Sequence, residues 1–230
     1  MVVFGAIHDR SVIVGRTGPT MSTNDPFAPI PLFAVPIFPT QISGFDEHRD
    51  ALLAHILDHK ARYAGSQRSN RNAWHSGEEF VHKPNEHVAW VLKRALKFAH
   101  LALAKYYNNW ATMDISLAGA WANVVGPGGW NAPHHHFPLH WSGVFYVSVG
   151  SMAHNPPGDP SGHIEFLNPT PWMGPMGQGG NFVISPKDGM AVLFPSSLYH
   201  FVHPHSSEEE RVSIAYNLSL HPKNRQPLGV

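Results

Sequence analysis

The feature of this sequence that most constrains its fold is the spacing of apolar residues, which changes from helical to alternating near residue 113. Beyond that point we expect short strands at residues 114–125, 141–149, 163–167, 181–185, 190–194, 199–202 and 212–220. Gly/Pro-rich turns, such as those at residues 126–129 and 156–158, separate these runs. Short strands at regular spacing with such turns are typical of a β-barrel or jelly roll.

The part of the chain before this sheet predicts two helices. Apolar residues recur there at three- and four-residue spacing within residues 43–63 and again within residues 85–107. We expect a polar loop at residues 64–84 between them, and an edge strand at the proline-flanked apolar run 32–38. The pattern therefore indicates a mainly β domain with flanking helices, in which a helical pair covers the sheet.

Composition indicates one globular domain. Hydrophobic residues make up 43% and charged residues 14% of the 230-residue chain. We expect residues 31–230 to form this domain and residues 1–30 to be an N-terminal extension. The net charge of zero gives no electrostatic footprint for nucleic acid or for an anionic membrane, so neither is expected as a partner.

The sequence contains no cysteine. This excludes disulfides, zinc ribbons, iron–sulfur clusters and thiol nucleophiles, and it fits a reducing compartment. No apolar run approaches the length of about 20 residues that a membrane span needs. The first residues also lack the order of basic, apolar and small residues that marks a signal peptide. We therefore expect a cytoplasmic protein.

Histidine placement predicts a metal site. One cluster comprises residues 134–136, followed by His140, and a second comprises His200, His203 and His205. The H-x-H pair His134 and His136 would project to one face of an extended segment, because side chains alternate along a strand. A third histidine from a later strand would complete a facial triad, which leaves coordination positions open. Imidazole suits Fe(II), and also Ni, Cu and Zn; the alternative is a loop of solvated imidazoles.

Arg211 and Ser213 predict an anion site near the second histidine cluster. Both would face the same side of the strand expected at 212–220. An arginine fork beside a hydroxyl suits one end of a dicarboxylate, which arginine binds through two parallel hydrogen bonds. The alternative is that Arg211 forms a surface ion pair with the acidic run at residues 208–210.

Several runs of the chain, taken in order, resemble the core of one protein family. They are WANVV at 121–125, H-x-H at 134–136, SGVFYV at 142–147, FPSSLYH at 194–200 and ERVSI at 210–214. Together these runs are similar to a family of 2-oxoglutarate/Fe(II)-dependent oxygenases. The similarity extends in order from about residue 32 to residue 220.

This resemblance implies a double-stranded β-helix, a cupin-like jelly roll, with Fe(II) and 2-oxoglutarate as cofactors. It also implies oxidation of an unactivated C–H bond. By position, His134 corresponds to the first iron ligand and His200 to the distal one. Arg211 then binds the far carboxylate of 2-oxoglutarate, with Ser213 beside it.

One position departs from the wider superfamily, which uses His-x-Asp or His-x-Glu. Here the residue two after His134 is His136. Either three histidines hold the iron, or a carboxylate comes from elsewhere, Glu165 being the nearest acidic candidate on a strand. We expect His136 to be the third ligand, because it already points the same way as His134.

Two further residues are candidates for contacting the co-substrate. Asn123 is polar within an otherwise apolar strand, so it bonds either the co-substrate or a neighbouring strand. Tyr146 is one of four aromatic residues close in sequence to the histidines, and those that face the cavity would exclude water and shape the pocket. The other three are Trp121, Trp130 and Trp141.

Three functions are compatible with the sequence. The first is a 2-oxoglutarate-dependent oxygenase that hydroxylates a small molecule or a peptide with molecular oxygen, as a monomer or a homodimer. The second is a cupin-like three-histidine dioxygenase that binds its substrate directly to the metal and needs no anchor at Arg211 and Ser213. The third is a barrel that binds metal or a small molecule without catalysis.

Overall fold

The structure is a computed structural model, and it describes residues 34–82, 84–151, 158–170 and 180–223. The chain from Pro36 onward forms one compact unit. The expected N-terminal extension, residues 1–30, lies outside the described residues.

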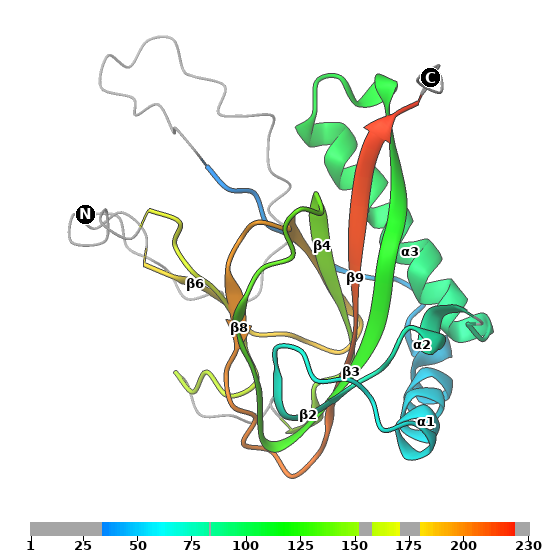
Figure 1. Cartoon of the computed structure of the whole chain (residues 1–230), viewed down its shortest axis with the longest axis vertical. Coiled ribbons are helices and arrows are strands. Elements are labelled where there is room, and N and C mark those ends of the chain that lie inside the picture. Colours follow the sequence, from blue (N-terminus) through cyan, green and yellow to red (C-terminus); the bar gives the residue numbers. More distant parts are fainter. Residues whose placement is uncertain (1–33, 83, 152–157, 171–179, 224–230) are drawn as a thin grey trace. The chain divides into compact units, whose positions relative to one another are not determined.

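This unit contains one sheet and a small group of helices (Figure 1). The helical elements are α1 (Asp46–Arg62), α2 (Glu79–His82), α3 (Glu86–Tyr106) and the short 3-10 helix η1 (Trp110–Thr112). The strands are β1 (Phe38–Gln41), β2 (Asn70–His75), β3 (Met113–His134), β4 (Trp141–Ser148), β5 (Ile164–Phe166), β6 (Phe182–Ile184), β7 (Met190–Pro195), β8 (His200–Val202) and β9 (Arg211–Pro222).

The strands form a curled antiparallel sheet, a half-barrel. Its order is β1-β7-β4-β9-β3-β8-β5-β6, and β2 pairs with β3 beside this path. In Figure 1 the helices lie on the outer side of the long β3–β9 pair, while β8 and β6 lie on the opposite side of the curl. The mainly β class and most strand positions predicted from the sequence are confirmed.

Strand β3 differs from the expectation at residues 126–129, where a turn was predicted. The chain stays extended there and changes partners: β3 pairs with β9 up to Val125, and with β8 at Asn131 and His134. Gly128 has a φ of +73°, and a side chain on Gly129 would lie 2.6 Å from the Asn72 carbonyl oxygen. The glycines therefore permit an irregularity within one strand, beside β2, rather than a reversal of the chain.

Residues 64–84 also differ from the expected polar loop, because they contain β2 and α2. Four of the six residues of β2 are polar and its two apolar residues, Ala73 and Trp74, are adjacent, so no apolar alternation marks it as a strand. Its first residue, Asn70, is buried and pairs with Asn131 of β3. The strand expected at residues 32–38 is also shifted, because β1 begins at Phe38 and pairs with β7.

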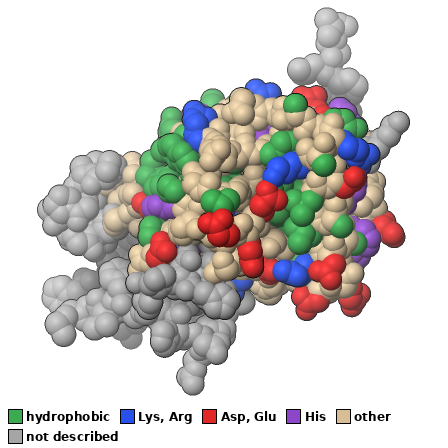
Figure 2. All heavy atoms as spheres, turned by 90° about the horizontal axis from the view of Figure 1, so that it is seen from below, with side chains coloured by type: hydrophobic (Ala, Val, Ile, Leu, Met, Phe, Trp, Pro, Cys, Tyr) green, Lys and Arg blue, Asp and Glu red, His purple; other side chains and the backbone are tan. Residues whose placement is uncertain are grey.

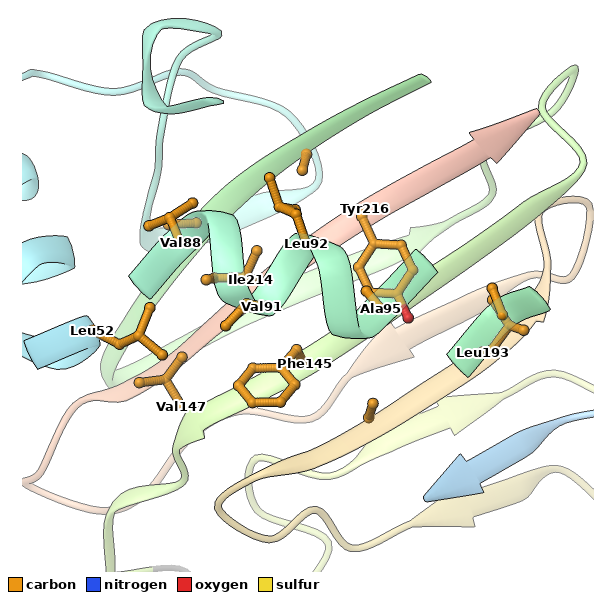
Figure 3. Close-up of a cluster of buried hydrophobic side chains, with 14 of the residues drawn as sticks. Leu52, Val88, Val91, Leu92, Ala95, Phe145, Val147, Leu193, Ile214 and Tyr216 are labelled. Carbon is orange, nitrogen blue, oxygen red and sulfur yellow. The ribbon is translucent and has the colours of Figure 1, made fainter. Parts of the chain in front are cut away.

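Helix α3 owes its position to a cap and an apolar stripe. The Asn85 side chain accepts a hydrogen bond from the Val88 backbone N–H at 2.8 Å, which caps the first turn. The buried stripe of α3 consists of Val88, Val91, Leu92, Ala95, Ala99 and Leu103. Figure 3 shows part of this stripe with Leu52 of α1 and the side chains of Phe145, Ile214 and Tyr216 from the sheet.

The two faces of the sheet carry different clusters, as strand alternation requires. On β9, Val212, Ile214 and Tyr216 belong to the cluster that also contains residues of α1 and α3. A second cluster, with Val144 and Tyr146 of β4, lies among β5, β7 and β8. Arg211 and Ser213 of β9 alternate with the first set, and they line the cavity described below.

The surface is mixed in charge. Figure 2 shows one face on which acidic and basic side chains of the described residues are interspersed. Among the helices in the described part of the chain, none combines the length and apolar character needed to cross a membrane.

Candidate functional site

Three histidines from two distant segments of the chain meet at one end of β3 and β8. His134 is the last residue of β3 and pairs with His200, the first residue of β8. His136 lies two residues further on, where its backbone N–H donates to the Ser196 carbonyl at 2.7 Å. The ring centroids are 4.4 Å apart for His134 and His200, 4.9 Å for His134 and His136, and 5.3 Å for His136 and His200.

One ring nitrogen from each of these histidines can serve a common metal ion, because the three atoms lie within 4.8 Å of one another. The Nδ1–H of His200 donates to the Leu198 carbonyl at 2.9 Å, and that of His134 donates to the Ala132 carbonyl at 2.7 Å. Such bonds fix the tautomer and leave Nε2 as the free acceptor. At His134, the Ser69 hydroxyl is 3.4 Å from this Nε2.

Burial keeps the cluster neutral and therefore suited to bind a metal. Desolvation lowers the pKa of His200 to about 3. Desolvation and the neighbouring His134 lower the pKa of His136 to about 4, and burial also lowers the pKa of His134. Because metal binding requires deprotonated imidazole, the three rings can bind a cation at neutral pH without losing a proton.

The remaining histidines of the two sequence clusters lie elsewhere. His135 is exposed, and its ring packs edge-on against Tyr199 at 4.7 Å. His203 pairs with Glu165 at 2.6 Å, and the Nε2–H of His205 donates to the Glu209 carbonyl at 2.6 Å. His140 accepts a hydrogen bond from the Leu220 backbone N–H at 3.2 Å.

Glu165, the alternative third ligand, is engaged away from the cluster. One carboxylate oxygen contacts His203, and the other accepts a hydrogen bond from the Asn181 amide at 2.6 Å. Within the described parts of the chain, the three histidines are the one group of potential ligands close enough together to hold a metal.

A cavity of about 960 Å³ connects the histidine cluster with the start of β9. His134, His136 and His200 line one part of it, and Arg211 and Ser213 line another. These sequence-predicted residues thus lie around one cavity, although they come from three separate segments, the end of β3, β8 and β9.

Arg211 is buried, with 2% of its surface exposed. Its Nε has no hydrogen-bond partner. No Asp or Glu of the described residues forms an ion pair with it, and burial lowers its pKa. A buried cation without a counter-ion is costly, so this guanidinium is suited to an anionic ligand. The surface ion pair with residues 208–210 is excluded by this burial.

Tyr146 and Asn123 complete this end of the cavity. The guanidinium carbon of Arg211 lies 5.0 Å from the centre of the Tyr146 ring, within range of a cation–π interaction. Asn123 is buried and pairs with Ser213, and its Oδ1 has no hydrogen-bond partner. Asn217, by contrast, ties a strand, because its Oδ1 accepts from the Ser142 hydroxyl at 2.7 Å.

The tryptophans have different surroundings. Trp121 lines the cavity beside His136, with ring centroids 5.6 Å apart. Trp141 belongs to the helix-side cluster, and half-buried Trp130 pairs with Arg71 of β2.

Sequence reasoning missed the contribution of residues 66–76. This segment adds Arg68, Ser69, Arg71 and His75 to the cavity lining. The available signal for this strand was the pair of asparagines at 70 and 131, which lie opposite each other on β2 and β3. A mainly polar strand, however, has no apolar periodicity from which it could be predicted.

The sequence of this core matches a known family. Residues 119–217, which include the three histidines, Arg211 and Ser213, match the family described as "Putative 2OG-Fe(II) oxygenase". This segment is similar to the 2-oxoglutarate/Fe(II) oxygenase family. No curated protein matches the sequence significantly.

Solved structures share the fold at low sequence identity. A prolyl-4-hydroxylase from Pseudomonas putida is 17% identical over 81% of this chain and 94% of its own, with a TM-score of 0.57. A prolyl hydroxylase from Trichoplax adhaerens, in complex with a hypoxia inducible factor oxygen degradation domain peptide fragment, is 12% identical over 80% and 83%, with a TM-score of 0.56. The epimerase SnoN of nogalamycin biosynthesis, solved with Fe3+, α-ketoglutarate and nogalamycin RO, is 10% identical over 85% and 88%, with a TM-score of 0.57. The half-barrel therefore has the jelly-roll fold of these oxygenases.

The match to this family indicates an oxidoreductase whose cofactors are Fe(II) and 2-oxoglutarate, as the sequence predicted. Two features of this chain fit those cofactors. The neutral histidine cluster supplies nitrogen donors for iron, and the unpartnered Arg211 Nε supplies a donor for a carboxylate.

Proposed function

We propose that His134, His136 and His200 hold Fe(II), and that Arg211 and Ser213 bind the distal carboxylate of 2-oxoglutarate. The observation that carries this proposal is the burial of Arg211, without a counter-ion, in the cavity that the three histidines also line. Asn123 and Tyr146 are proposed to contact the co-substrate beside Arg211, since both line that part of the cavity.

When bound, iron and 2-oxoglutarate supply an oxidative decarboxylation that uses molecular oxygen to oxidise a substrate C–H bond. The chain's own groups bind, orient and exclude water. Carbonyl oxygens of Ala132 and Leu198 hold two of the imidazoles in the tautomer that offers Nε2. Phe166 and Phe194, whose rings lie 6.0 Å and 4.7 Å from that of His200, limit access of water to that side of the cluster.

We infer that the protein acts on a small molecule or a peptide. Both classes occur among the structural neighbours, since one is solved with a peptide fragment and another with nogalamycin RO. The double-stranded β-helix, with the helical pair packed on its outer face, is proposed as the rigid frame for this chemistry. A homodimer stays a prediction.

Two other functions are less well supported. A cupin-like dioxygenase that binds its substrate directly to the metal has no use for a buried arginine in the same cavity. A non-catalytic barrel would not need three neutral histidines that leave coordination positions open.

The test is spectroscopic and requires no substrate. Fe(II) is added to the protein without oxygen, followed by 2-oxoglutarate, and the visible spectrum is recorded. A weak charge-transfer band that saturates with 2-oxoglutarate is expected, because chelation to Fe(II) produces it. Stoichiometric iron binding without such a band would favour the cupin-like function, and failure to bind iron would contradict the proposal.

A further inference from the structure

One wall of the cavity has no role in holding the proposed iron or 2-oxoglutarate. It is formed by the turn and strand at residues 66–76, together with Trp121 of β3. These residues line the same cavity as the histidine cluster, and Ser69 lies within 3.4 Å of His134. A molecule bound against this wall would therefore be close to the metal centre.

This wall has a fixed shape. The buried Asn70 amide group donates to the carbonyls of Ser66 and Ala73, and its Oδ1 accepts from the Arg68 backbone N–H at 2.6 Å. The Ala132 backbone N–H of β3 donates to the Ser69 carbonyl at 2.8 Å. Because a buried side chain and a neighbouring strand both hold the turn, the backbone positions that carry Arg68 and Arg71 are fixed.

The wall is basic. Among the residues that line the cavity, Glu78 is the acidic one, whereas Arg68 and Arg71 are basic in addition to Arg211. Nη1 of Arg71 donates to the carbonyls of Arg68 and Asn70, both at 2.9 Å, so its guanidinium is partly engaged. The guanidinium of Arg68 has no hydrogen bond or ion pair with any described residue.

The wall also has a flat aromatic part. The rings of His75 and Trp121 stack with centroids 5.3 Å apart and planes 13° apart. The His75 Nδ1–H donates to the Ser76 carbonyl at 2.6 Å, which fixes the orientation of the ring. Trp121 in turn lies beside His136. Stacking covers one face of each ring, so a planar group can pack against the outer face of either ring.

We propose that the substrate of this site is an anion, a carboxylate or a phosphate, attached to a planar group. Arg68 binds the anionic group, and the Trp121–His75 pair packs against the planar group so that the substrate lies beside the histidine cluster. The inference names the substrate class for the proposed oxygenase, so its relevance to catalysis rests on that function. The binding interactions themselves involve no metal.

The test uses fluorine NMR to measure how tightly para-fluorobenzoate binds to the protein. The protein is loaded with Fe(II), saturated with 2-oxoglutarate and kept without oxygen. Saturating 2-oxoglutarate occupies Arg211, so the remaining affinity reports the outer wall. We expect saturable binding, and at least about tenfold weaker binding of the neutral para-fluorobenzamide, because it lacks the charge-assisted hydrogen bond. Para-fluorophenyl phosphate in place of the benzoate shows which anion fits better.

Variants identify the residues. Arg68→Ala is expected to weaken para-fluorobenzoate binding roughly tenfold, while Lys97→Ala, which removes an exposed cation of α3 outside the cavity, leaves it unchanged. Arg68→Glu is the sharper variant, because it should reject the benzoate and gain affinity for para-fluorobenzylammonium. Trp121→Leu should reduce the preference for para-fluorobenzoate over cyclohexanecarboxylate.

Equal affinity for the benzoate and the benzamide, or unchanged benzoate affinity in Arg68→Ala, would overturn the inference. The same titrations are repeated on the metal-free protein, where the dependence on Arg68 should persist. Failure to bind Fe(II) or 2-oxoglutarate would count against the proposed function alone. Normal binding of both, without a dependence of benzoate affinity on Arg68, would remove the substrate class alone.

Discussion

Arg211 lies with its guanidinium carbon 5.0 Å from the centre of the Tyr146 ring, and no carboxylate of the described residues neutralises it. The aromatic face provides part of the stabilisation that water would give an exposed arginine. It does not replace a counter-ion, so a dicarboxylate bound here would gain a strong partner and remove an unfavourable burial.

The first prediction concerns this pair. Arg211→Ala should weaken 2-oxoglutarate binding by about a hundredfold, because a charge-assisted contact in a dry site is lost. Arg211→Lys should recover part of the affinity, since it keeps the charge without the planar fork. Calorimetric titration of the Fe(II) protein without oxygen measures both. Unchanged affinity in Arg211→Ala would remove the co-substrate assignment.

The same residue predicts an effect on stability. Arg211→Met should raise the free energy of unfolding of the metal-free protein, by about 1 kcal/mol or more, because it removes an unpaired buried charge. Added 2-oxoglutarate should stabilise the wild-type protein and leave Arg211→Met unaffected. Urea denaturation with and without 2-oxoglutarate checks both effects.

Iron binding should depend on His200 and not on the histidines of the two sequence clusters that lie outside the triad. His200→Ala is expected to lose Fe(II) at equilibrium, because one of three ligands is removed. His135→Ala is the matched control, since His135 is exposed and faces Tyr199. Iron per chain, measured after dialysis, distinguishes them. Full iron occupancy in His200→Ala, together with loss of iron in His203→Ala, would show that His203 and not His200 is the iron ligand.

The third ligand can be tested with paired variants. His136→Ala should lose iron, whereas Glu165→Ala should keep it and lose on the order of 1 kcal/mol of stability, because its partners His203 and Asn181 are left unpaired. His136→Asp should still bind Fe(II), now with two histidines and one carboxylate. Loss of iron in Glu165→Ala alone would exclude the three-histidine site.

The metal-free protein should lose stability in mild acid. Burial lowers the pKa of His136 to about 4 and that of His200 to about 3, whereas unfolded histidine titrates near 6.5. Between these values the unfolded chain binds more protons, so the free energy of unfolding falls as the pH drops from about 6.5 toward 4. Urea denaturation across this range should show a slope on the order of 1 kcal/mol per pH unit, reduced in His200→Gln. A flat profile would contradict the burial of these rings.

Much of the fold was predictable because its signals are local. Alternating apolar residues marked β4, β7 and β9 within one or two residues, and three-to-four spacing marked α1 and α3. The histidine cluster was predictable for the same reason, since H-x-H on an extended segment constrains two side chains at once. Strand alternation also placed Arg211 and Ser213 on one face, and the resemblance assigned them to 2-oxoglutarate.

The rest depended on contacts between distant residues. β2 is a mainly polar strand, held by the buried Asn70 and by pairing with β3, and neither feature leaves a periodic pattern. Residues 126–129 have the composition of a turn, yet packing against Asn72 keeps them within a strand. For this reason the Arg68 and His75 side of the cavity could not be anticipated.

The continuity of β3 limits how this protein can move. β3 pairs with β9 up to Val125 and with β8 from Asn131 within one strand, so the hydrogen-bond ladders on both sides of the cavity share one backbone. A hinge between the two ladders would have to bend residues 126–129, where the Asn72 carbonyl occupies the space beside Gly129. The distance between the histidine and arginine ends of the cavity should therefore stay the same when ligands bind and dissociate. Conformational change should be confined to the side chains at the rim of the cavity.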